Sequence, residues 1–159
     1  MSGRRAARTA APALAALALA ALPGCGGRDE EAYGTAVNAF CTDVRASLRG
    51  FEREASAAGS AGDSETAARA FGGAVERLSA RLRRSTGALR DADPPEQYAR
   101  FDAQAVRGFE EAARRLDGLA ASARAGDLDA LRDIDRRLGD LDVPAAPPDL
   151  RRSAPACRS

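Results

Sequence analysis

Apolar side chains recur every three or four residues along most of this chain, which is the period of an amphipathic α-helix. No stretch alternates apolar and polar residues as a half-buried strand would. The pattern is interrupted by a small-residue turn at 57–62, by the prolines at 94–95 and by Gly126. It therefore predicts an all-α fold with four helices. Their apolar positions are, in chain order, Tyr33, Val37, Phe40, Val44, Leu48 and Phe51; Phe71, Val75, Leu78, Leu82 and Leu89; Tyr98, Phe101, Ala105, Phe109, Leu116 and Leu119; and Leu128, Leu131, Ile134, Leu138 and Leu141.

The second and third predicted helices begin at residues that favour helix N-termini. Asp63 or Ser64 can cap the second helix, because a short polar side chain accepts bonds from the first free backbone N–H groups. For the third helix we expect Asp93 to be the N-cap, with Pro94 in the first turn. Glu96 would complete a capping box with Asp93.

The short connections between these helices favour antiparallel neighbours. We therefore expect residues 30–142 to form an up-down four-helix bundle. Residues 143–159 are rich in proline, and we expect them to form an extended tail beyond the bundle.

The N-terminus has the layout of a secretory signal peptide. Arg4, Arg5 and Arg8 precede an apolar run from Ala10 to Leu22, which is too short to span a bilayer. The run ends in Leu22, Pro23, Gly24 and Cys25, which resemble the lipobox of bacterial lipoproteins.

This resemblance implies that residues 1–24 are removed as a lipoprotein signal peptide and that Cys25 becomes the lipidated first residue. Residues 25–29 would then be a short tether. The chain would lie in the cell envelope, anchored to the extracytoplasmic face of the membrane by acyl chains such as palmitate. An ordinary cleaved signal that happens to end at a cysteine is the alternative.

Two further cysteines, Cys41 and Cys157, remain in the exported chain. An even number of cysteines in an oxidising compartment predicts a disulfide, with free thiols or intermolecular pairing as alternatives. A tail from 143 can reach back to Cys41 in the first helix, because a fourth helix would end beside the start of the first. The disulfide and the helix count support each other.

The short tether also orients the predicted bundle. The connection at 91–95 and the start of the tail would lie near the membrane, and the connections at 58–64 and 125–128 would lie far from it. Arg151 and Arg152 in the tail would face either solvent or anionic lipid headgroups.

The composition excludes several classes of chemistry. The chain has no His and its basic residues are all Arg, so it has no Ser-His-Asp triad, phosphate-loop lysine, Schiff-base lysine or His-ligated metal. A net charge of +1 argues against a dedicated nucleic-acid binder. We expect no cofactor, no metal and no enzymatic activity.

Acidic residues mostly precede arginines by four positions, as in exposed helix-stabilising pairs. The expected pairs are Glu65–Arg69, Glu96–Arg100, Glu110–Arg114, Glu111–Arg115 and Asp133–Arg137. Asp102 lies beside an apolar stripe, where we expect a salt bridge with an arginine.

An early-helix cysteine, a Pro-Pro-Glu helix start and a near-terminal cysteine make the chain similar to small helical lipoproteins of high-GC bacteria, at Cys41, Pro94, Pro95, Glu96 and Cys157. The resemblance implies no activity. We interpret the chain as a non-enzymatic binding or structural module. Its partner beyond the membrane is left open among proteins, cell-wall polymers and small molecules.

Two alternatives remain. In the first, the chain carries a small apolar or cationic ligand between its helices. In the second, ranked lower, it cleaves cell-wall glycan with a carboxylate. The aromatic residues decide the first alternative, because they either fill the core or line a pocket. These residues are Tyr33, Phe40, Phe71, Tyr98, Phe101 and Phe109.

Overall fold

The computed structural model describes residues 26–60, 62–127 and 143–158, and every regular element in these ranges is helical. The elements are α1 (Gly26–Gly59), α2 (Ser64–Arg90), η1 (Glu96–Tyr98), α3 (Ala99–Arg124), α6 (Leu150–Ser153) and η2 (Pro155–Cys157). The predicted fourth helix and the signal peptide lie outside the described residues.

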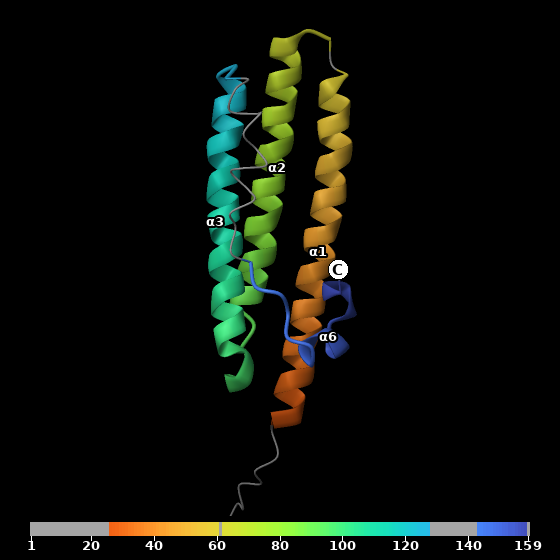
Figure 1. The fold of residues 1–159 in the computed structure, drawn as a ribbon, viewed down its shortest axis with the longest axis vertical. Helices are drawn as coiled ribbons and strands as arrows, with labels where there is room; N and C mark the ends of the chain where they lie inside the picture. Colours follow the sequence, from red (N-terminus) through yellow and green to blue (C-terminus); the bar gives the residue numbers. More distant parts are fainter. Residues whose placement is uncertain (1–25, 61, 128–142, 159) are drawn as a thin grey trace, which may run out of the picture.

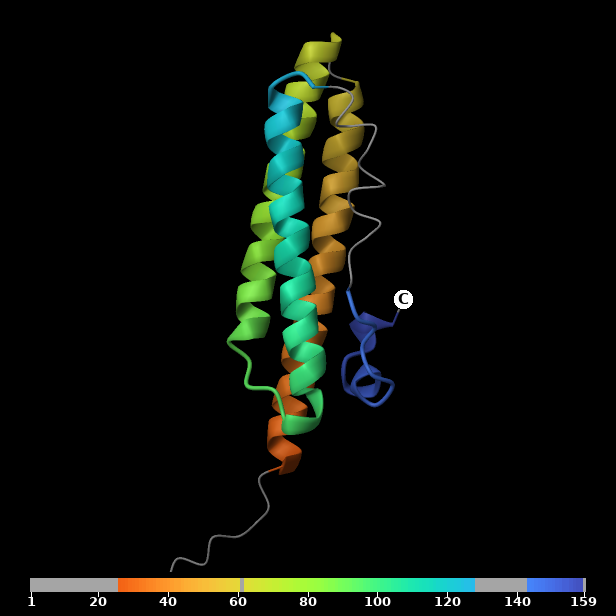
Figure 2. The same cartoon turned by 60° about the vertical axis from the view of Figure 1, so that its left-hand side comes forward.

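The three long helices run antiparallel in succession, and α2 packs against both α1 and α3 (Figure 1). The connection at 91–95 lies at the same end as the start of α1. The connections after α1 and α3 lie at the opposite end, which confirms the predicted distribution of connections. The C-terminal segment, residues 143–158, lies beside the lower half of this bundle (Figure 2).

The start of α2 confirms the predicted cap. The Asp63 carboxylate accepts hydrogen bonds from the backbone N–H groups of Glu65 and Thr66 at 3.0 and 2.9 Å. Gly62, with a φ of 83°, supplies the left-handed turn just before this cap.

The predicted start of α3 is wrong, because Asp93 does not cap it. Pro95 has φ −54° and ψ 149°, and the first helical turn is the 3₁₀ turn η1 from Glu96. A residue that precedes a proline is disfavoured in the helical region, so Pro95 prevents Pro94 from starting a helix. The α-helix begins only at Ala99.

The prediction of a fully extended tail is also wrong. Residues 143–147 have no regular structure, but α6 and η2 then form two short helical turns. Pro155 is at the start of η2, where a proline costs no hydrogen bond. Leu150 and Ala154, one helical turn apart, are both buried against the bundle, and this burial stabilises the turns.

The buried side chains form two groups. The lower core joins α1, α3 and the C-terminal segment, and includes Tyr33, Val37, Phe40, Leu89, Tyr98 and Leu150. The upper core joins α2 and α3, and consists of Val75, Leu78, Leu82, Leu116, Leu119 and Ala120.

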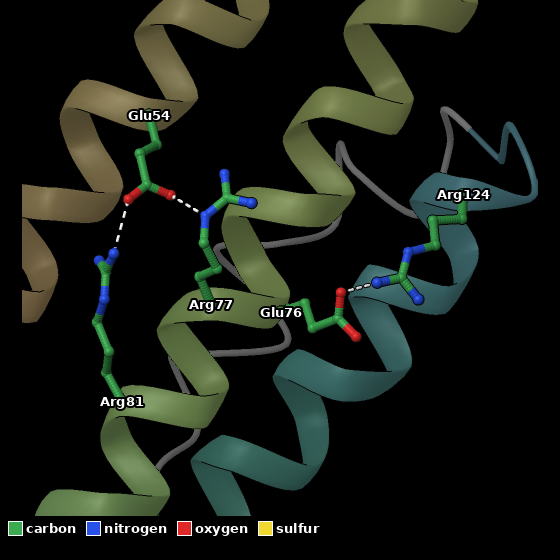
Figure 3. A network of polar contacts seen from close by, with 5 residues as sticks. All are labelled: Glu54, Glu76, Arg77, Arg81 and Arg124. Atoms are coloured by element: carbon green, nitrogen blue, oxygen red, sulfur yellow. Dashed lines mark hydrogen bonds and ion pairs between the residues drawn. The ribbon is translucent and has the colours of Figure 1, made fainter.

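Ion pairs cross the outside of the upper half (Figure 3). Glu54 of α1 pairs with Arg77 and Arg81 of α2 at 2.7 and 2.8 Å, and Glu76 of α2 pairs with Arg124 of α3. The hydrogen bonds from Arg81 and then Arg77 lower the pKa of Glu54. These contacts connect α2 to both of its neighbouring helices.

The predicted pairs within helices form in part. Glu65–Arg69 and Glu111–Arg115 are present at 3.2 and 2.8 Å. Glu110 instead pairs with Arg90 of α2. The surface charges therefore hold helices together as well as stabilising single helices.

Candidate functional site

A cavity of about 330 Å³ lies between α1, α3 and the C-terminal segment. This volume is within the range of about 300–1,000 Å³ that is typical of small-molecule sites. We call it the tail cavity. Its helical walls consist of Val37, Phe40, Cys41 and Val44 from α1 and Phe101, Ala105 and Phe109 from α3. Leu89 of α2, residues 143–146, Ala156 and Cys157 add to this lining, as do Arg45 and Arg151, so the tail cavity is mostly apolar.

The helical period accounts for these walls. Phe101, Ala105 and Phe109 are four residues apart, so they share one face of α3. The small side chain of Ala105 leaves room between the two rings. The Phe109 ring meets the Phe40 ring of α1 edge-to-face, with centroids 4.8 Å apart.

The C-terminal wall is held in place by covalent and polar contacts. The predicted disulfide between Cys41 and Cys157 is present and joins α1 to η2, with a Cα–Cα distance of 5.3 Å. The Asn38 side-chain oxygen accepts a hydrogen bond from the Ala156 backbone N–H at 2.9 Å. At the other end of the segment, the Tyr98 hydroxyl donates to the Asp149 carboxylate at 2.6 Å. These contacts attach residues 149–157 of the segment to α1 and η1.

A glycine lets the C-terminal segment approach α1 closely. A Cβ atom on Gly34 would lie 2.6 Å from the Ser153 hydroxyl oxygen and 2.7 Å from its Cβ, so any side chain there would displace α6. Leu150 fills the adjacent core and is fully buried. The sequence pattern missed both contacts, although the spacing of Leu150 and Ala154 is a weak signal of a buried turn.

A buried polar pair lies below the tail cavity. Asp102, only 9% exposed, accepts a hydrogen bond from the Tyr33 hydroxyl at 3.0 Å. Within the described part of the chain this tyrosine takes the place of the predicted arginine. Burial raises the pKa of Asp102, and the bond from Tyr33 offsets part of that rise. Burial, followed by the Asp102 charge, raises the pKa of Tyr33.

The structure divides the predicted aromatic set between core and cavity. Phe40, Phe101 and Phe109 line the tail cavity. Tyr33 and Tyr98 stack with centroids 5.7 Å apart in the lower core. Phe71 instead packs against Phe51 at the other half of the bundle. Phe40 also belongs to the lower core, and the binding of a ligand by these rings stays a prediction.

A second hollow, of about 420 Å³, lies between α1 and α2 and has a polar lining. Its lining includes Glu54 and Arg81, which already pair with each other. Within the described ranges, no group of three His, Cys, Asp or Glu side chains could hold a metal ion. The tail cavity is therefore the better candidate for a ligand site.

The predicted lipidation residues Leu22, Pro23, Gly24 and Cys25 lie outside the described part of the chain. None of the described helices has the length and apolar content needed to cross a membrane. Comparisons with protein-family models, with curated proteins and with solved structures find no match for this chain.

Proposed function

We propose that this chain is a lipid-anchored, non-enzymatic binding protein of the cell envelope that holds a small apolar molecule in the tail cavity. The observation that carries the proposal is a preformed, mostly apolar cavity with three phenylalanine rings in its wall. Apolar, largely preformed cavities are the usual sites of small-molecule binding. This cavity favours a carrier over a purely structural module.

The location of the protein is part of the proposal. The lipobox-like residues 22–25 supply the anchor at Cys25. An intact disulfide between Cys41 and Cys157 fits an oxidising compartment outside the cytoplasm. In this proposal residues 127–142 form the fourth helix of an up-down bundle, as their apolar period predicts.

The lining of the cavity favours binding without catalysis. The described residues of the cavity lining include no carboxylate, and the chain has no His or Lys to act as a base or nucleophile. The buried carboxylate of Asp102 is bonded to Tyr33. A glycan-cleaving reaction would need a carboxylate that faces its substrate.

Equilibrium dialysis of radiolabelled decanol tests the proposal. The lipidated full chain is placed in phosphatidylcholine nanodiscs, and empty nanodiscs measure the decanol that partitions into lipid. We expect saturable binding of one decanol per chain. If nanodiscs that contain the protein take up no more decanol than empty nanodiscs, the proposal is overturned.

A matched pair of variants localises the binding. Val44→Trp places an indole in the wall of the tail cavity and should abolish decanol binding. Leu48→Trp, one helical turn away at a residue that is 44% exposed and outside the lining, should leave it unchanged. If the two substitutions change decanol binding equally, the ligand does not bind in the tail cavity.

A further inference from the structure

Among the described residues that line the tail cavity, the charged ones are both arginines. These are Arg45 of α1 and Arg151 of α6. The long stems of arginine can extend an apolar wall while their guanidinium groups stay at its edge. The apolar cavity therefore has a basic border.

The arginines at this border are gathered by hydrogen bonds to backbone carbonyls. The Arg45 guanidinium donates to the carbonyl oxygen of Arg158. The Arg158 Nε donates to the carbonyl oxygen of Arg151 at 3.0 Å. A carbonyl oxygen accepts a hydrogen bond without neutralising the cation, so Arg45 and Arg158 keep their positive charges.

Some arginines of the described bundle have carboxylate partners, as Arg77 and Arg81 have in Glu54. Among the described residues, no carboxylate forms a salt bridge with Arg45, Arg151 or Arg158. Like charges held together repel one another, and an anion placed between them removes that repulsion. The planar guanidinium group also matches the two oxygens of a carboxylate.

We propose that the ligand of the tail cavity is a single-chain amphiphile with a terminal anionic group. Its alkyl chain lies against Phe40, Phe101 and Phe109, and its anionic group lies between Arg45 and Arg151. This inference rests on the proposed binding function. It replaces the sequence-based alternative of a cationic ligand, because two guanidinium groups would repel a cation.

The size of the cavity limits the chain length. Water occupies about 30 Å³ per molecule in the liquid. A cavity of about 330 Å³ therefore holds roughly ten non-hydrogen atoms of an alkyl chain. Decanoate is accordingly a suitable probe.

The test compares three ten-carbon probes that differ in their head groups. Decanoate, decanol and decyltrimethylammonium are dialysed against the lipidated full chain in phosphatidylcholine nanodiscs, with empty nanodiscs as the reference. We expect decanoate to bind about tenfold more tightly than decanol, which corresponds to about 1.4 kcal/mol. Decyltrimethylammonium should bind more weakly than decanol.

Arginine variants identify the groups that recognise the anion. Arg45→Gln and Arg151→Gln should each reduce the preference for decanoate over decanol, measured as the ratio of the two dissociation constants. Arg152→Gln removes a neighbouring exposed arginine that is not in the lining and should have no effect. An equal effect of Arg152→Gln would indicate nonspecific attraction to a basic surface and contradict the assignment.

The outcomes separate this inference from the proposed function. If decanol and decanoate bind equally well and Val44→Trp abolishes both, the cavity binds ligands but the anionic preference is wrong. If no probe shows saturable binding, the proposed function itself fails. If decanoate binds equally well to wild type and Val44→Trp, the arginines bind anions outside the cavity, as they would bind the headgroups of an anionic lipid surface. That result overturns the inference.

Discussion

The lower and upper halves of this bundle are held together by different means. In the lower half, aromatic rings and a buried hydroxyl–carboxylate pair join α1 to α3, and a disulfide attaches the C-terminal segment to α1. In the upper half, leucine, valine and alanine fill the space between α2 and α3, and ion pairs join neighbouring helices. Cross-linking and a cavity occur together in the lower half. The disulfide therefore adds a covalent link to a wall that buried side chains and hydrogen bonds also hold.

The largest expected effect comes from removing the disulfide with Cys41→Ala and Cys157→Ala. This disulfide joins residues that are 116 positions apart. The chain-entropy model gives an upper value of about 5 kcal/mol for its contribution to the free energy of unfolding, and native disulfides typically contribute about 2–4 kcal/mol. We expect hydrogen exchange to increase in residues 33–44 and 150–157 while residues 75–82 and 113–120 keep their protection. Equal loss of protection in both halves would show that they unfold as one unit.

A pair of leucine truncations should separate stability from binding. Leu116→Ala in the upper core and Leu150→Ala in the lower core each remove a fully buried side chain and should cost about 3 kcal/mol. Only Leu150→Ala should also weaken decanoate binding, because Leu150 supports the C-terminal wall. Thermal unfolding and dialysis measure the two effects. Weaker binding in Leu116→Ala would contradict the independence of the two halves.

Tyr33→Phe should destabilise the lower core by about 2 kcal/mol at neutral pH, because it leaves the Asp102 carboxylate buried without its donor. Burial raises the pKa of Asp102 in the folded state. Protonated Asp102 therefore stabilises the fold at acid pH, and this contribution is lost as the pH rises through the folded pKa. The cost of Tyr33→Phe should therefore shrink in acid. Urea unfolding from pH 3 to 7 measures it, and a cost that does not change with pH would contradict this account.

The smallest effect is expected in the ion pairs of the upper half. Glu54→Gln should cost at most about 1 kcal/mol, because Arg77 is largely solvated and salt screens the pair. The two guanidinium groups lower the pKa of Glu54, so its contribution is present at neutral pH and is lost as the pH falls. This pH dependence is opposite to that of Asp102. Urea unfolding at low and high salt should show the cost only at low salt.

Local patterns predicted the three long helices that the structure describes, because a period of three and four residues shows directly which face is buried. The Asp63 cap and the disulfide were predictable for similar reasons, since each depends on residue type and count. The start of α3 was mispredicted because the second proline, Pro95, overrides a good capping sequence. The turns of the C-terminal segment depend on the burial of Leu150, which only the folded bundle determines.

The candidate site was predictable only in part. Phe40, Phe101 and Phe109 were among the expected ligand-lining aromatic residues, but Tyr33 and Tyr98 have the same spacing and fill the core instead. Periodicity identifies the inward face of a helix without showing whether a neighbour fills the space beside it. The basic border was not predictable, because it brings together residues from α1 and the C-terminal segment that are far apart in the sequence.

The mass of the intact protein, extracted gently from the membranes of cells that make it, tests the central claim most directly. The account predicts residues 25–159 with attached acyl chains and one disulfide, together with one bound small acid that is released when the disulfide is reduced. A chain without acyl groups would contradict the proposed anchor. An oxidised, lipidated chain with no bound molecule, whose empty cavity also fails to take up added decanoate, would contradict the proposed ligand site.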